Sequence, residues 1–316
     1  MIGRFPVTLV KNRKQRGGAS GFGRKESLYG YLFLTPWLLG LFVLTLGPLL
    51  ASLYLSFTHY NLLSSPDWAG VANYRNMFTN DPRYLQSLKV TSIYVFLSVP
   101  LKLVFALGIA MLLNKGISGL SLYRAVFYVP SLLGGSVAIA LLWRQVFGRE
   151  GIVNRLLNSV GVSDPPSWMA HPDYALYPLI ILAIWQFGSP MLIFLAGLKQ
   201  IPEDLYEAAS IDGAGAISKF FRITVPLITP VIFFNLVLQM ISAFQVFTPA
   251  YIMGGGTGGP RDSMLFYTLY LYQQGFVNMN MGYAAAMAWV LLGIIAAFTA
   301  INFFLSRYWV FYQDAG

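Results

Sequence analysis

Strongly apolar stretches separated by short polar segments are the dominant pattern along this chain. A helix of about 20 apolar residues crosses the hydrocarbon core of a bilayer. Stretches of this length predict six membrane-spanning helices, at residues 31–57, 90–113, 125–147, 174–198, 227–251 and 283–305. Segment 265–276 is also apolar, but the glutamines and asparagines at its end favour a helix at headgroup depth over a seventh crossing. The expected fold class is all-α, a polytopic membrane protein.

The composition excludes several other classes of protein. Hydrophobic residues make up 56% of the chain and charged residues only 10%, which a soluble domain of this size does not show. Cysteine is absent, so disulfides and thiolate metal sites are excluded. His59 and His171 are isolated, without the neighbouring ligands of a metal site. The net charge of +9 is not concentrated in a patch interleaved with aromatic residues, so no nucleic-acid partner is expected.

The distribution of lysine and arginine predicts the orientation in the membrane. With six spans, 13 of the 21 basic residues fall on one side and 7 on the other, when Arg144 near the end of the third span is counted with the second group, while Lys102 lies well within a span. Both termini are therefore expected in the cytoplasm, with residues 1–27 as a basic cytoplasmic tail and 28–316 as the transmembrane domain. The first apolar run is too long for a cleaved signal and should remain as an anchor. The glycine-rich run 254–260 lacks the GK[ST] ending of a phosphate-binding loop, so a flexible outer loop is expected.

The polar segment between the fourth and fifth spans, residues 199–226, is longer than a simple connection requires. Pro202 suits a helix start, and the acidic residues after it complement the helix N-terminus. Gly213 permits a sharp reversal before a second short apolar stripe that leads into the fifth span. The pattern predicts a helix-turn-helix that projects into the cytoplasm and enters a groove of a partner.

The same segment carries a recognisable motif. Glu207-Ala208-Ala209, Gly213, Ile223 and Pro226 have the spacing EAA-x3-G-x9-I-x2-P. This resembles the cytoplasmic motif in permease subunits of binding-protein-dependent ABC importers, with Val225 in place of the usual leucine. Residues 201–214 further resemble the carbohydrate-uptake branch, which includes permeases for maltose, glycerol-phosphate and alginate oligosaccharides. The likeness covers roughly residues 28–310.

The resemblance implies a type I ABC importer permease fold and a set of partners. A second homologous permease, two ATPase subunits, an extracytoplasmic solute-binding protein and the lipid of a bacterial inner membrane are expected. ATP and Mg would be bound by the ATPase subunits, because this chain has no P-loop motif; it would carry no cofactor and would not itself be an enzyme. Segment 199–226 would be the coupling loop, with Glu207, Ala208, Ala209 and Gly213 as the ATPase-coupling residues.

The substrate pathway is predicted from polar residues inside the spans. Asn235, Gln239, Ser242 and Gln245 recur at helical spacing, and Trp185, Gln186 and Trp289 are candidates to complete a sugar pocket. The alternative role of the polar stripe is hydrogen bonding between helices. Lys102 costs about 2.5 to 3.5 kcal/mol in a span unless it is paired or hydrated. It either makes a structural contact or attracts an acidic sugar or a glycerol-phosphate compound.

These observations predict the permease subunit of an ATP-driven importer that moves a sugar or oligosaccharide across the inner membrane by alternating access. Two alternatives remain open: a membrane channel or scaffold subunit not coupled to ATP, and an ABC permease for a non-sugar solute. The sequence does not decide the length or charge of the sugar, or whether the second permease is a different chain.

Overall fold

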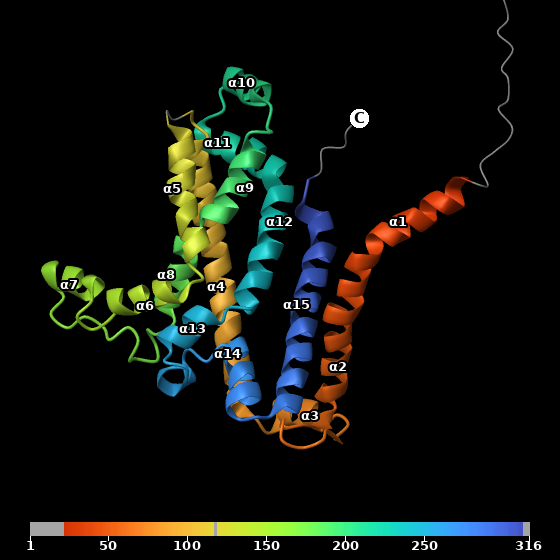
Figure 1. Ribbon diagram of the computed structural model, residues 1–316. Coiled ribbons are helices and arrows are strands. Elements are labelled where there is room, and N and C mark those ends of the chain that lie inside the picture. Colours follow the sequence, from red (N-terminus) through yellow and green to blue (C-terminus); the bar gives the residue numbers. More distant parts are fainter. Residues whose placement is uncertain (1–21, 117–118, 312–316) are drawn as a thin grey trace, which may run out of the picture. The chain divides into compact units, whose positions relative to one another are not determined.

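The computed structural model describes residues 22–116 and 119–311, and these fall into two units with the boundary between Ser52 and Leu53 (Figure 1). Residues 1–21 of the expected basic tail lie outside the described residues. Helix α1 (Phe22–Leu39) begins within that tail and continues through the π-helical turn η1 (Gly40–Leu46) into α2 (Gly47–Ser56). Its apolar part, Tyr31–Ser56, is long enough to cross a membrane and occupies the first predicted span.

Three further helices of the described residues are long and apolar enough to span a bilayer. They are α4 (Pro82–Leu113), the continuous helix Ala216–Phe244, and α15 (Met281–Trp309). The continuous helix is formed by α11 (Ala216–Lys219), a π-helical turn η2 (Phe220–Thr224) and α12 (Val225–Phe244). Helix α4 packs against α12 and against several further helices of the described residues, and its Val95, Ala106 and Ala110 are completely buried. The core of the second unit therefore lies around α4.

Two predicted spans are broken helices. Residues 125–147 form α5 (Leu120–Leu133) and α6 (Val137–Val146), which meet at 96°, and residues 174–198 form α8 (Tyr177–Trp185) and α9 (Gly188–Leu198), which meet at 43°. The sharper break follows Gly134 and Gly135, and the Ser136 side chain accepts a hydrogen bond from the Ile139 N–H to cap the new helix. The all-α class is confirmed, and the count of six spans holds when each bent pair is taken as one span.

The fifth predicted span differs from the observed helix at both ends. Residues 227–251 were expected to be one helix, but α12 ends at Phe244 and a separate short helix, α13 (Thr248–Met253), follows. Pro249 explains the break, because it has no N–H for the next helical hydrogen bond and its ring crowds the preceding turn. At the other end the helix extends back to Ala216. The second half of the coupling loop and the fifth span therefore form one continuous helix.

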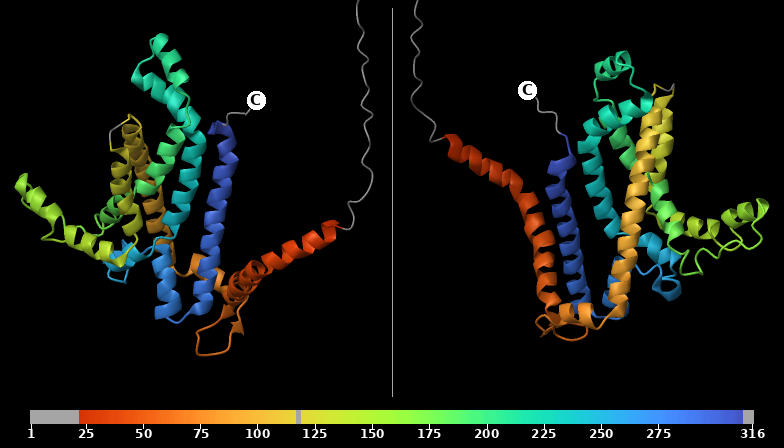
Figure 2. Two further views of the ribbon diagram at one scale, coloured as in Figure 1. Left: turned by 45° about the horizontal axis from the view of Figure 1, so that its top comes forward. Right: turned by 180° about the vertical axis from the view of Figure 1, so that it is seen from behind.

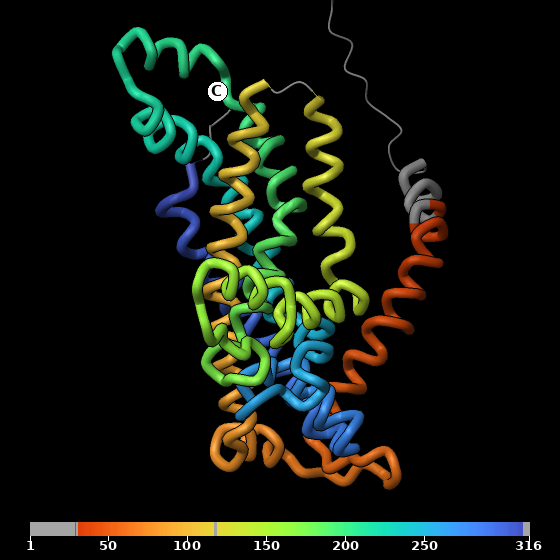
Figure 3. Tube along the Cα trace, turned by 90° about the vertical axis from the view of Figure 1, so that its left-hand side faces the viewer, coloured from red at the N-terminus to blue at the C-terminus, as the bar shows by residue number. Residues whose placement is uncertain are grey.

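The remaining elements connect the spans at the two ends of the second unit. Helix α10 (Glu203–Ile211) projects at one end, and α3 (Ala72–Thr79), α14 (Tyr267–Tyr272) and the first turns of α4 and α15 lie at the other (Figures 2 and 3). Segment 265–276 forms α14 and part of a π-helical turn, η4 (Gln273–Val277), too short to cross. The other short elements are α7 (Ile152–Ser159), η3 (Pro260–Asp262), and the antiparallel strands β1 (Thr58–His59) and β2 (Asp67–Trp68).

Candidate coupling loop and translocation cavity

Helix α10 forms the exposed part of the coupling loop, residues 199–226. Pro202 precedes its first residue, and Glu203 and Asp204 lie in its first turn, where negative charge is favourable. Gly213 ends it in the left-handed conformation, with φ +77°. The Gly213 N–H donates to the Ser210 carbonyl at 3.1 Å and the Ala214 N–H to the Ala209 carbonyl at 2.8 Å. This pair of bonds is a Schellman motif, which requires a residue that tolerates positive φ.

Apolar side chains are exposed around the turn of the hairpin. Ile211 is 87% exposed, and Ile217 and Phe221 on the next helix are also largely exposed. Of the predicted coupling residues, Glu207 and Ala208 are exposed and Ala209 is half-buried. Small side chains beside exposed apolar groups are suited to close contact with another protein surface.

Two hydrogen bonds fix α10 to the long helix Ala216–Phe244. The hydroxyls of Tyr206 and Thr224 lie 2.9 Å apart, and the Lys219 Nζ donates to the Ser210 Oγ at 2.5 Å. Thr224 is buried within the continuous helix, so the contact joins α10 to a firmly packed residue. The two contacts therefore link α10 to the helix that continues into the fifth apolar span.

A cavity of about 280 Å³, lined by both polar and apolar side chains, lies between α4, α8 and the junction of α12 with α13. Five of the residues predicted for the substrate pathway line it: Lys102, Gln186, Gln239, Ser242 and Gln245. They come from three separate parts of the chain, with Gln245 at the C-terminal cap of α12. The cavity also contains Tyr94, Phe247 and Thr248, which offer an aromatic and hydroxyl surface for a sugar ring.

The other three predicted pathway residues lie outside the cavity lining. Asn235 is completely buried in α12, and neither polar atom of its side chain has a hydrogen-bond partner among the described residues. The Trp185 ring packs on Trp143, with 5.3 Å between ring centroids. Trp289 belongs to α15, which does not line the cavity. Their part in the pathway remains a prediction.

Ser98 is a cavity residue that the sequence analysis missed. It lies one helical turn before Lys102, is 1% exposed, and its Oγ has no hydrogen-bond partner among the described residues. Spacing of four residues on a helix places Ser98 on the face of Lys102. This four-residue spacing from Lys102 is the sequence signal that could have identified Ser98 as a cavity residue.

The break between α8 and α9 positions Gln186. The Ser131 Oγ donates to the Gln186 carbonyl at 2.9 Å and accepts from the Ser189 N–H at 2.9 Å, so one hydroxyl satisfies backbone groups on both sides of the break. A side chain at Gly134 would collide with the Gln186 side chain, since an added Cβ would lie 2.2 Å from its Cδ. The glycine therefore leaves room for Gln186 beside the cavity.

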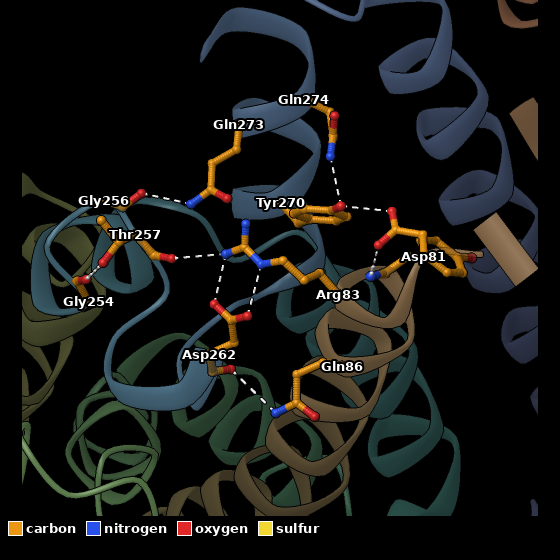
Figure 4. A network of polar contacts seen from close by, with 11 residues as sticks. Asp81, Arg83, Gln86, Gly254, Gly256, Thr257, Asp262, Tyr270, Gln273 and Gln274 are labelled. Atoms are coloured by element: carbon orange, nitrogen blue, oxygen red, sulfur yellow. Dashed lines mark hydrogen bonds and ion pairs between the residues drawn. The ribbon is translucent and has the colours of Figure 1, made fainter. Parts of the chain in front are cut away.

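A network of polar contacts holds the glycine-rich loop at the end opposite α10 (Figure 4). Arg83 makes a bidentate ion pair with Asp262, at 2.7 and 2.9 Å, and the Gln273 Nε2 donates to the Gly256 carbonyl at 2.8 Å. The Gln86 Nε2 also donates to the Asp262 carbonyl at 3.4 Å. The run 254–260, expected as a flexible loop, is thus attached to α4 and η4.

Asp81 joins three helices in the same region. Its carboxylate accepts hydrogen bonds from the hydroxyls of Tyr270 at 2.7 Å and Tyr283 at 2.6 Å, and it caps α4 by accepting from the Tyr84 N–H at 3.0 Å. Burial, and then the hydrogen bond to Asp81, raises the pKa of Tyr270 above its usual value. The hydroxyl therefore remains protonated and continues to donate.

Broken and continuous spans, a cavity with several polar groups and an exposed helical hairpin at one end are the features of a multi-pass membrane protein. Residues 78–309 match the family described as "Binding-protein-dependent transport system inner membrane component", and the chain belongs to this family. The predicted resemblance to the permease subunit of a binding-protein-dependent ABC importer is confirmed. Its role is transport, not catalysis.

Relatives extend over nearly the whole chain. It is 53% identical over 291 residues to the "Probable ABC transporter permease protein YesP" of Bacillus subtilis (strain 168), covering 92% of this chain and 94% of the relative. It is 32% identical to the "Lactose transport system permease protein LacF" of Rhizobium radiobacter, over 91% and 97% of the two chains. The fold is shared with a chain in the crystal structure of a bacterial alginate ABC transporter, with a TM-score of 0.77, 20% identity, and coverage of 92% and 98%.

Proposed function

We propose that this chain forms half of the translocation pathway of an ATP-driven importer for a sugar or oligosaccharide. A second homologous permease completes the pathway, an extracytoplasmic binding protein delivers the sugar, and two ATPase subunits bind ATP and Mg. The sugar transported by the lactose relative and the amide and aromatic lining of the cavity support a carbohydrate substrate.

The continuous helix Ala216–Phe244 is the observation that carries the proposal. One end joins α10 through Tyr206 and Thr224, and the other end lines the cavity with Gln239 and Ser242. From Ala216 to Ser242 the helix extends about 39 Å at 1.5 Å per residue. Closure of the ATPase subunits would displace α10, and the long helix would carry that displacement to the cavity and open it to the opposite side.

The predicted coupling residues have distinct roles in this mechanism. Glu207 supplies a charged contact to the ATPase, Ala208 and Ala209 permit close approach, and Gly213 sets the turn. The coupling loop and both termini then face the cytoplasm. The basic residues on that side of the membrane support this orientation.

Disulfide crosslinking tests the contact with the ATPase, because the chain has no cysteine of its own. Ala208→Cys, at an exposed position of α10, is co-expressed with ATPase subunits that carry single cysteines beside their nucleotide sites. We expect a crosslink whose yield changes when ATP is added.

Ser159→Cys is the matched control, since Ser159 is exposed on α7, away from α10 (Figure 1). It should form no crosslink with the ATPase. Absence of a crosslink from Ala208→Cys in a correctly assembled complex would instead support a membrane subunit not coupled to ATP.

A further inference from the structure

We infer that the cavity receives a sugar bearing a carboxylate, with Lys102 as its counter-ion. The inference rests on the proposed import of a sugar or oligosaccharide and specifies the chemical class of that sugar. It is drawn from the position of a single cation among neutral residues in the interior of the membrane domain.

Lys102 lies well within α4, 20 residues beyond the helix start at Pro82, and lines the cavity. It makes no hydrogen bond or ion pair with any residue that the structure describes. An ammonium group at this depth of a membrane helix is unfavourable unless it is hydrated or paired. The cavity is large enough to admit water, which a ligand entering it would displace.

The membrane spans found among residues 22–116 and 119–311 hold no acidic residue that could neutralise Lys102. All 12 aspartates and glutamates lie outside the candidate spans. Among the described residues that line the cavity, Lys102 carries the only formal charge, because all the others are neutral. A neutral sugar would leave the ammonium without a partner, whereas one carboxylate would balance it.

The groups around Lys102 are also suited to the rest of an acidic sugar. The Ser98 hydroxyl lies one turn away on the same helix and has no hydrogen-bond partner among the described residues. Gln186, Gln239 and Gln245 present amides that both donate and accept, as sugar hydroxyls require. The lining therefore combines one site for an anion with several sites for hydroxyl groups.

The experiment uses the complete complex, with partner permease, ATPase subunits and binding protein, in proteoliposomes. The probes are pairs of trisaccharides that differ only in a C6 carboxylate or a C6 hydroxymethyl group, in the gluco, galacto and manno series. We expect uptake of the carboxylate member of at least one pair to be about tenfold faster. Lys102→Gln should remove the preference, and Lys102→Arg should retain it.

Lys89→Gln is the matched control, because Lys89 lies on the same helix but outside this cavity. It should leave the preference unchanged. If Lys102→Gln reduced uptake of both trisaccharides of a pair equally, the inference would be overturned, and the result would point to a pairing between Lys102 and the second permease. Uptake of neutral sugars alone would also overturn it, whereas uptake of no sugar at all would count against the sugar importer itself.

Discussion

Two glycines near the turn of the coupling loop have different conformational demands. Gly213 has φ +77°, whereas Gly215 caps α11 with φ −72°, and an added Cβ at either position would meet no atom within 4 Å. The requirement at Gly213 is therefore one of backbone conformation alone. At Gly215 any residue with ordinary backbone angles is acceptable.

Gly213→Pro is expected to uncouple ATP hydrolysis from uptake while the protein remains inserted in the membrane. Proline cannot adopt this φ and has no N–H to donate to Ser210, so the hairpin turn is lost. We expect uptake to fall about tenfold, as for a docking contact weakened by 1.4 kcal/mol. Uptake and ATP hydrolysis are measured together, with Gly215→Ala as the control that retains both. Normal coupled uptake in Gly213→Pro would contradict the role assigned to the turn.

Gly188→Ala is expected to destabilise the membrane domain. An added Cβ would lie 2.2 Å from the Phe127 carbonyl oxygen and 2.7 Å from the Tyr128 Cα, which are backbone atoms that cannot rotate away. Overpacking of this kind costs about 1–3 kcal/mol. The apparent melting temperature of the purified protein should fall, while Gly293→Ala, in open space within α15, should leave it unchanged or raise it. Equal melting temperatures for the two variants would refute the close packing of α5 and α9.

At the scale of whole elements, Asp81 determines where α4 begins and what its first turn contacts. Asp81→Ala removes the helix cap and the shared acceptor of Tyr270 and Tyr283. We expect a loss of about 3 kcal/mol from the cap and the charged hydrogen bonds together. This loss of stability would be seen as faster limited proteolysis within residues 254–262 and as a lower melting temperature. The control is Asp67→Ala, at an exposed position in β2, which should change neither the proteolysis nor the melting temperature. If Asp81→Ala also changed neither, Asp81 would not be needed to hold the start of α4.

The ends and breaks of the helices show how far the sequence predicts the elements. Hydropathy located all six apolar stretches but placed the start of the second at residue 90, because the first turns of α4 are polar. The cap at Asp81 and Pro82 in the first turn were the signals for the earlier start. Pro249 likewise signalled the end of α12. The 96° angle after Gly134 was not predictable, because glycine permits a bend without fixing its direction.

The whole molecule brings together site residues that the sequence separates. The coupling motif was recognisable because its residues are contiguous and its geometry is local. Five pathway residues meet in the cavity, but helical spacing does not show which part of a helix adjoins it. Asn235 lies on the same helical stripe as Gln239, one turn before it, yet the Asn235 side chain is completely buried. Tertiary packing of α12 against α4 and α9 decides that difference.

The topology of the whole chain depends on whether α5 and α6 together cross the membrane. Helix α5, with 14 residues, is about 21 Å long and does not cross a core of about 30 Å alone. If the bent pair returned to its starting side, every later segment would be inverted and α10 would face outward. Single cysteines at three highly exposed positions, Leu63, Val160 and Ile211, decide this. We expect a membrane-impermeant maleimide to label Leu63→Cys and Val160→Cys in intact spheroplasts and Ile211→Cys only after permeabilisation. Labelling of Ile211→Cys from outside, with Val160→Cys protected, would show that the pair does not cross and that the coupling loop cannot reach a cytoplasmic ATPase.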